Sequence, residues 1–194
     1  GMNLSSSNPT LTNVTIESNT ANMGGGIIMS YSNHPILTNV IIANNTADCL
    51  SPGGYCGGGM YISYSDPTLN NVTIVSNTAA NGNGGGVFFH NANNPTLTNV
   101  TITGNTASYG GGMVLYNSNP TLINSIIWDN SPESIYLQNG GEELIISYSN
   151  IEGGWTGEGN IDSDPLFTDP ESGDYSLQTV SPSIDSGDPN LWYE

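Results

Sequence analysis

Residues 8–21 read NPTLTNVTIESNTA, and residues 24–29, after a two-residue gap, read GGGIIM. The same phrase begins again at four later prolines, Pro35, Pro67, Pro95 and Pro120. Counted from Pro9, successive copies are 26, 32, 28 and 25 residues apart, and the long second copy carries an insertion over residues 48–56. Repeats of this length are typical of proteins that stack similar units, because one unit cannot bury its apolar side alone.

Each copy holds three short segments of alternating apolar and polar residues, and none has a helical period. In the first copy these are residues 10–12, 14–16 and 27–29, bounded by Pro, Asn and Gly. Such segments are typical of strands joined by tight bends. We therefore predict an all-β fold, a parallel β-helix (solenoid) with three short strands per coil and a spacing of about 4.8 Å between coils.

Equivalent positions of the copies should form rows along the stack. Three rows are expected to point inward: Leu11, Leu37, Leu69, Leu97 and Leu122; Val14, Val40, Val72, Val100 and finally Ser125; and Ile16, Ile42, Ile74, Ile102 and Ile127. Two asparagine rows are expected at bends: Asn13, Asn39, Asn71, Asn99 and Asn124, and Asn19, Asn45, Asn77, Asn105 and Asn130. Asn tolerates a left-handed backbone, and its amide can bond to its copy one coil away. Both rows are predicted to be structural.

The pattern loosens after Pro120, which sets the expected organisation of the chain. We assign residues 1–151 to the coils and residues 152–194 to an irregular acidic C-terminal cap, packed on the last coil within the same domain. Such a cap covers a strand edge that would otherwise invite polymerisation. The chain begins part-way through a repeat, so we expect it to belong to a larger parent protein.

Over roughly residues 8–149, the repeats resemble bacterial right-handed parallel β-helix repeat proteins of the pectin-lyase-like superfamily. The tail, with Asn160-Ile161-Asp162-Ser163-Asp164-Pro165-Leu166-Phe167, is similar to a C-terminal portion common in that group. The glycine and Ile-x-x-Asn motifs are also similar to repeats of chlamydial polymorphic outer-membrane proteins, which have Phe where this chain has Ile16 and its equivalents. The resemblance implies right-handed coils and a secreted or cell-surface bacterial protein, in a group mostly without known activity.

The composition excludes several classes of function. The 194 residues include no Lys or Arg and 17 Asp or Glu, so the formal net charge is −17. Binding to nucleic acid, or to anionic lipid through a polybasic segment, needs Lys or Arg and is not expected. Mechanisms that use a Schiff-base lysine, a P-loop lysine or an arginine finger are excluded for the same reason. No apolar run reaches about 18 residues, so we expect no membrane insertion.

The repeats offer little for catalysis. The resemblance implies a calcium-assisted elimination with an Arg or Lys base for the lyases of the superfamily, and the chain has neither residue. Glycoside hydrolysis instead needs two carboxyl groups about 5–9.5 Å apart, and the acids before residue 130 are too widely spaced. The weak catalytic candidates are His34 and Asp66, which precede proline in consecutive copies and should lie about 4.8 Å apart. The alternative is a surface contact between two bend residues.

The acidic tail contains a candidate metal site, made of Asp162, Asp164, Asp169, Glu171 and Asp174. Carboxylates at such spacing can hold calcium, the only cofactor that the sequence suggests, and the alternative is a set of solvated turn residues. Within the insertion, we predict a disulfide between Cys49 and Cys56, which would imply an oxidising compartment. The alternative there is a metal site, which two cysteines without a nearby His support poorly.

Aromatic residues form the candidate ligand-binding surface. Tyr61, Phe88 and Tyr136 are expected to point outward from the third strand, beside Tyr31 and Tyr64. Exposed aromatic stripes mark contact surfaces, and sugar rings stack on such side chains. The expected partner is therefore a polysaccharide or a surface protein. The alternative is that the rest of the parent protein, or a neighbouring chain, covers this stripe.

Taken with the composition, these rows predict a non-enzymatic, structural or adhesive module, secreted or at the cell surface, that presents a surface to polysaccharide or protein. An alternative from another class is a polysaccharide-degrading enzyme, either a carboxylate-based hydrolase or a calcium-assisted lyase. A third is an ice-binding protein, because outward pairs such as Thr10/Thr12 and Thr96/Thr98 resemble the Thr-x-Thr array of ice-binding β-helices.

Overall fold

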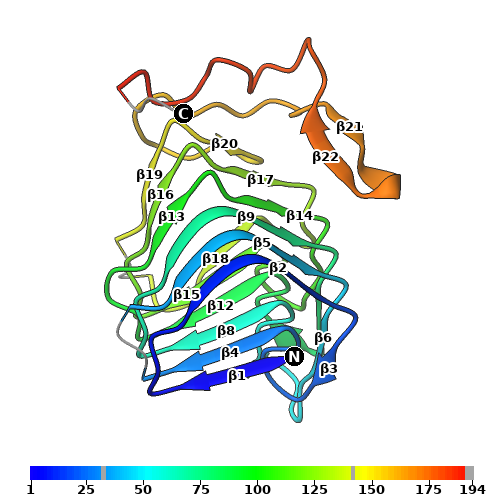
Figure 1. Cartoon of the computed structure of the whole chain (residues 1–194), viewed down its shortest axis with the longest axis vertical. Coiled ribbons are helices and arrows are strands. Elements are labelled where there is room, and N and C mark those ends of the chain that lie inside the picture. Colours follow the sequence, from blue (N-terminus) through cyan, green and yellow to red (C-terminus); the bar gives the residue numbers. More distant parts are fainter. Residues whose placement is uncertain (32–33, 141–142, 191–194) are drawn as a thin grey trace.

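The computed structural model describes residues 1–31, 34–140 and 143–190. In this part of the chain, strands from successive repeats lie side by side and parallel, and coil follows coil along one axis (Figure 1). The predicted all-β parallel solenoid is confirmed. Its only helical element among the described residues is the 3-10 turn η1 (Pro170–Ser172), so no described helix is long and apolar enough to cross a membrane.

Two large sheets form the sides of the stack. Sheet A contains β1 (Met2–Ser5), β4 (Ile27–Ser30), β8 (Met60–Ser63), β12 (Val87–His90), β15 (Met113–Tyr116) and β18 (Ile135–Leu137). Sheet B contains β2 (Thr10–Glu17), β5 (Ile36–Ala43), β9 (Thr68–Val75), β13 (Thr96–Thr98), β14 (Thr101–Thr103), β16 (Thr121–Ile123), β17 (Ile126–Trp128), β19 (Ile145–Ser147) and β20 (Asn150–Ile151). Each sheet thus takes a contribution from every coil.

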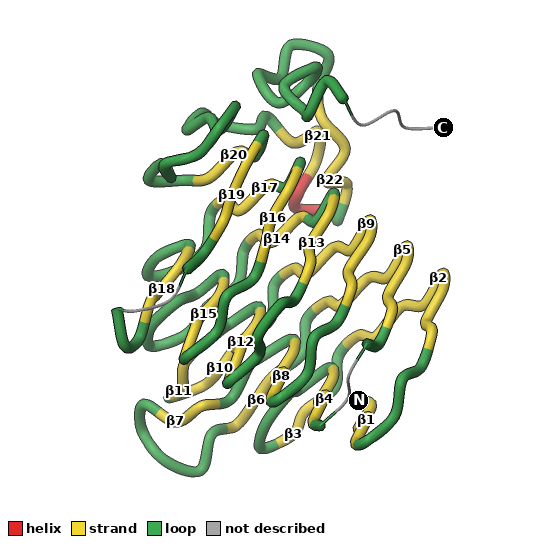
Figure 2. Tube along the Cα trace, turned by 90° about the vertical axis from the view of Figure 1, so that its left-hand side faces the viewer, coloured by secondary structure: helices red, strands yellow, loops and turns green. Residues whose placement is uncertain are grey.

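Three smaller sheets complete the fold. The third side of the stack contains β3 (Thr20–Ala21), β6 (Thr46–Asp48) and β10 (Thr78–Ala80). The insertion adds β7 (Gly54–Tyr55), which pairs with β11 (Gly82–Asn83). In Figure 2 the loop before β7 projects beyond the coils. The only antiparallel pair in the described part is β21 (Phe167–Asp169) with β22 (Asp174–Leu177).

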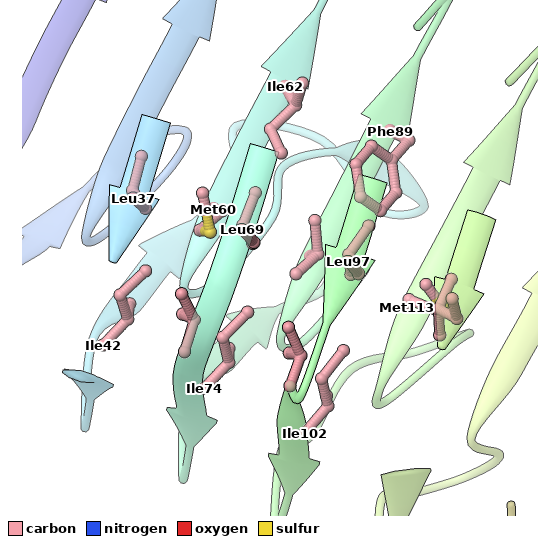
Figure 3. Packing of buried hydrophobic residues seen from close by; sticks show 14 of the residues in the cluster. Leu37, Ile42, Met60, Ile62, Leu69, Ile74, Phe89, Leu97, Ile102 and Met113 are labelled. Atoms are coloured by element: carbon pink, nitrogen blue, oxygen red, sulfur yellow. The ribbon is translucent and has the colours of Figure 1, made fainter. Parts of the chain in front are cut away.

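The register confirms the repeat alignment. Leu11 pairs with Leu37, Leu37 with Leu69, and so on along the row. The row continues into Ile146 of a further coil that the repeat phrase does not mark. The inward rows are fully buried from the second coil onward, and the close-up in Figure 3 shows them interdigitating with Met and Phe from sheet A. Burying one such side chain contributes about 1.5–3 kcal/mol to the free energy of folding, so each coil adds a similar amount of stability.

The two asparagine rows differ in backbone conformation, which corrects the prediction for the second row. Asn13 and its four equivalents have φ near 50–55°, in the left-handed region. Strands β2, β5 and β9 therefore bend within one continuous element. In the second row the left-handed residue is instead the one before the Asn, for example Ser18 before Asn19. Those Asn residues are selected for their amides alone.

The glycine triplets allow coils to approach closely. The first glycine, such as Gly24 with φ +54°, makes the left-handed corner. At the second position the limit is space, because a Cβ on Gly25 would lie 2.5 Å from the carbonyl oxygen of Gly58 in the next coil. The first glycine of a triplet therefore serves the bend, and close packing between coils explains the second.

The C-terminal part of the chain has two sections. Residues 152–163 close the last coil: Trp155 packs against the core, and the Asn160 side chain bonds to the backbone of Ser149 and Ile146. Residues 164–190, which we call the strap, then fold against the outside of sheet B. The strap is the orange and red segment that lies above the coils in Figure 1, with the β21–β22 hairpin on its right. Residues 191–194 of the predicted cap lie outside the described residues.

Two hydrogen bonds anchor the strap. The Asn150 Nδ2 group donates to Ser183 Oγ at 2.8 Å, and the backbone N–H of Asp188 donates to Asn124 Oδ1 at 2.7 Å. The strap therefore contacts the last coil at Asn150 and the coil before it at Asn124.

Candidate functional site

Two exposed tyrosines stack at the corner that follows β4 and β8. Tyr31 and Tyr64 have φ values of 54° and 47°, and this left-handed backbone turns both side chains out of the coil. Their rings lie 5.2 Å apart and within 3° of parallel. Tyr31 is 66% exposed and Tyr64 is 49% exposed. The in-register repeat thus presents two parallel aromatic faces, one per coil.

Amides continue this corner in the next three coils. Asn117 Nδ2 donates to Asn91 Oδ1 at 3.1 Å, and Asn139 Nδ2 donates to Asn117 Oδ1 at 3.0 Å. We call the five residues Tyr31, Tyr64, Asn91, Asn117 and Asn139 the tyrosine–amide row. Asn139 was missed in the sequence because the phrase is lost after Pro120, although β18 still pairs with β15 in register.

His90 connects this row to the interior. Its Nε2 lies 3.3 Å from Asn91 Nδ2, and a 3.0 Å hydrogen bond joins its Nδ1 to Ser63 Oγ. The ring also meets the edge of Tyr64, with centroids 5.7 Å apart. Burial lowers the pKa of the His90 imidazole, so the neutral ring is favoured.

Three of the predicted surface aromatics are not freely exposed, which corrects the expected stripe. Phe88 is fully buried and Tyr61 is 9% exposed, and Tyr136 is half-buried against Tyr109. These side chains do point away from the coil. Phe88 is covered because Tyr55 stacks on it, with ring centroids 5.0 Å apart. Burial also raises the pKa of the Tyr61 hydroxyl.

Tyr55 lies in the insertion, where the repeat gives no prediction for its position. The structure joins Cys49 to Cys56 through a disulfide, with Cα atoms 5.9 Å apart. The bond packs on Gly82 of the next coil, where a Cβ would collide with Cys49 Sγ. The disulfide and the β7–β11 pairing together place Tyr55 over the aromatic cluster, which leaves Tyr31 and Tyr64 as the accessible pair.

A family model for the right-handed β-helix region matches residues 1–107, which is more than half of the chain. The chain belongs to this family. No curated protein and no solved structure matches it. Membership of the right-handed β-helix family agrees with the stacked parallel coils and supplies their hand. It does not bear on the bacterial source or on the chlamydial resemblance.

In this member of the β-helix family, His34 and Asp66 serve separate bends. Asp66 Oδ1 accepts the backbone N–H of Asn94 at 3.0 Å, and the backbone N–H of His34 donates to Asn8 Oδ1 at 3.1 Å. No hydrogen bond or ion pair joins the two side chains, both of which belong to the described residues. Bridging one coil to the next is a role that Asn performs equally well at this position and accounts for both residues, so an acid–base role for the pair stays a prediction.

Of the five tail carboxylates, Asp169 and Asp174 are paired in the β21–β22 hairpin, but no three come together. Among the described residues, no three His, Cys, Asp or Glu side chains form a group that could hold a metal ion. Asp164 and Asp174 each accept the N–H two residues further on, and Asp169 caps η1 through Ser172. Hydrogen bonds from Ser176 lower the pKa of Asp174. Turn formation accounts for these residues, and calcium remains a prediction.

The outward threonines of sheet B form two in-register columns. Thr68 and Thr96 lie side by side, with a 3.3 Å bond between their hydroxyls. Ile36 and Asn70 interrupt the columns in neighbouring coils. The outward side chains of this face are therefore regularly spaced, but they are not all threonines, as the Thr-x-Thr array of ice-binding β-helices would require.

Proposed function

We propose that this chain is a non-enzymatic module that binds polysaccharide along the tyrosine–amide row, in a structural or adhesive role. The proposal is supported above all by the parallel, exposed rings of Tyr31 and Tyr64. Pyranose rings stack on such faces, and the amides that follow can donate to and accept from sugar hydroxyls. The row is a rigid surface because each of its members is held by a coil in register with the next.

A neutral glycan suits the row best. The chain has a formal net charge of −17 and no Lys or Arg, so acidic polysaccharides would be repelled. A secreted or cell-surface location is proposed with it, and the Cys49–Cys56 disulfide supports this because such bonds persist in oxidising compartments. A surface protein is the alternative partner.

A glycan array with the intact chain tests the proposal. Binding to neutral glycans is expected, and Tyr31→Ala combined with Tyr64→Ala should weaken it by about tenfold. An aromatic contact contributes about 0.5–1.5 kcal/mol, and about 1.4 kcal/mol corresponds to tenfold. Tyr109→Ala is the matched control, since Tyr109 is half exposed and lies outside the row. Equal losses in the control and the double variant would contradict the proposal.

Incubation of the same glycans with the chain tests the non-enzymatic part. We expect no new reducing ends and no unsaturated products at any pH from 5 to about 9, because the row contains no carboxylate or basic group. Product formation by the purified chain would instead favour the hydrolase or lyase alternative.

A further inference from the structure

A groove separates the strap from the corner of sheet B. It has a volume of ≈ 880 Å³. Its coil side is lined by Asn71, Asn99 and Asn124 of the first asparagine row, of which Asn71 is exposed and the other two are half-buried. Its strap side is lined by residues 183 and 185–189. The strap is hydrogen-bonded to the coils at Asn150 and Asn124. The groove is the space left between the strap and the coils around these two contacts.

A second groove of ≈ 620 Å³ lies on the other side of β22. Tyr175 and Ser176 line this second groove, whereas the next residue, Leu177, lines the first. The second groove continues over Thr101, Thr73 and equivalents in earlier coils. The two grooves are therefore neighbours, separated by one strand, and together they run across several coils. An extended ligand fits this shape better than a compact one.

The lining of the first groove specifies the chemistry of the ligand. Ile126, Leu177 and Tyr148 offer apolar faces, and the row amides offer donors and acceptors at the coil spacing. Asp185 and Asp188 add carboxylates. A hydrogen bond with Glu158 raises the pKa of Tyr148 to about 12, so its hydroxyl stays protonated. No Lys or Arg exists in the chain to attract an anion.

We propose that this groove is a second binding site, for a linear, neutral polysaccharide. Carboxylates and amides accept hydrogen bonds from pairs of sugar hydroxyls, the apolar faces of the rings pack on the apolar lining, and uronic acids are repelled. The site is independent of the tyrosine–amide row, because that row follows the strands of sheet A whereas the groove lies outside sheet B.

The test is calorimetric titration of the intact chain with cellohexaose, xylohexaose and mannohexaose, and with hexagalacturonate as the acidic counterpart. At least one neutral hexasaccharide should bind, and hexagalacturonate should not. Ile126→Trp places a large side chain in the groove and should weaken binding by at least about tenfold. Ile36→Trp is the matched control, an outward Ile of the same sheet that does not line the groove, and it should bind as the wild type.

Two further variants keep the result interpretable. If Ile126→Trp does not fold, Asp185→Asn with Asp188→Asn retains the size of both side chains and should still weaken the neutral sugar by several-fold. These titrations start from the Tyr31→Ala, Tyr64→Ala double variant, because the tyrosine–amide row would bind the same neutral sugars and this variant leaves only the groove. Loss of all binding in the double variant would count against the groove and leave the proposed function intact. Absence of binding by all three neutral sugars, equal binding of hexagalacturonate, or wild-type affinity in the folded groove variants would overturn the proposal.

Discussion

The two asparagine rows have the same residue in successive coils and differ in almost every other respect. The first row lies at an exposed or half-exposed corner, where Asn39 donates to Asn13 at 3.2 Å and Asn71 donates to Asn39 at 3.3 Å. In the second row Asn45, Asn77 and Asn105 are completely buried. Sequence repetition is equal in the two rows, so it does not reveal which of them stabilises the fold more.

The difference lies in how many groups each amide satisfies. Asn77 Nδ2 donates to the carbonyl of Ile42 at 2.9 Å and to Asn105 Oδ1 at 3.0 Å. Its Oδ1 accepts from both the backbone and the side chain of Asn45. A buried Asn of this row therefore connects three coils, whereas an Asn of the first row mainly supplies a left-handed backbone. The second row requires Asn for the hydrogen bonds of its side chain, and the first row requires it for the left-handed φ angle.

Asn77→Ala should cause the largest effect. The substitution leaves the backbone N–H of Asn45 and the carbonyl of Ile42 buried without partners. Each such group costs about 1–3 kcal/mol, so the free energy of unfolding should fall by about 3–5 kcal/mol. Urea denaturation followed by circular dichroism measures this change. A loss below about 1 kcal/mol would break the distinction between the rows.

Asn71→Ala should cost less, about 1–2 kcal/mol, because Asn71 has a φ of 52° and alanine lacks the short polar side chain whose local hydrogen bonding lets Asn adopt the left-handed region. Asn71→Gly tolerates this φ and should stay within about 0.5 kcal/mol of the wild type. Both values come from the same denaturation experiment. If Asn71→Gly destabilised the protein as much as Asn71→Ala, the hydrogen bonds of the exposed amides would contribute more than the backbone conformation. Both rows would then stabilise the fold through their side chains.

His90→Gln should have the smallest effect, confined to the pH dependence of stability. Burial lowers the pKa of folded His90, so the unfolded chain binds a proton first as the pH falls. The contribution of the neutral ring is complete above about pH 6.5 and decreases as the pH falls through that value. Unfolding free energies at pH 7.5 and about 5.5 should therefore differ less in His90→Gln than in the wild type.

His34→Gln is the control for this measurement, because His34 is the other histidine of the chain and is exposed. It should keep the wild-type slope. A slope lost equally in both variants would show that the burial of His90 is not the source of the pH dependence.

Most features that repeat were predictable. Of the features that occur once, the Cys49–Cys56 disulfide was predicted, whereas the positions of Tyr55 and of the strap were not. The Leu, Val and Ile rows follow from spacing alone. Side chains alternate between the two faces of a strand, and the coils stack in register, so only one set of apolar residues can point inward. Tyr55 covers Phe88 only because an insertion unique to one coil brings it there. The strap likewise has no copy elsewhere in the chain, so nothing in the pattern places Asp188 beside Asn124.

Coil length has little influence on the geometry of the buried row. Asn19 and Asn45 are 26 residues apart and Asn45 and Asn77 are 32, yet both amide pairs meet at 3.0 Å. The extra residues leave the stack between β6 and β8 and return without disturbing the register. This scaffold consequently has a natural position for grafting: a foreign peptide inserted between Cys49 and Cys56 would be displayed from the side of the rod, with both of its ends already held together.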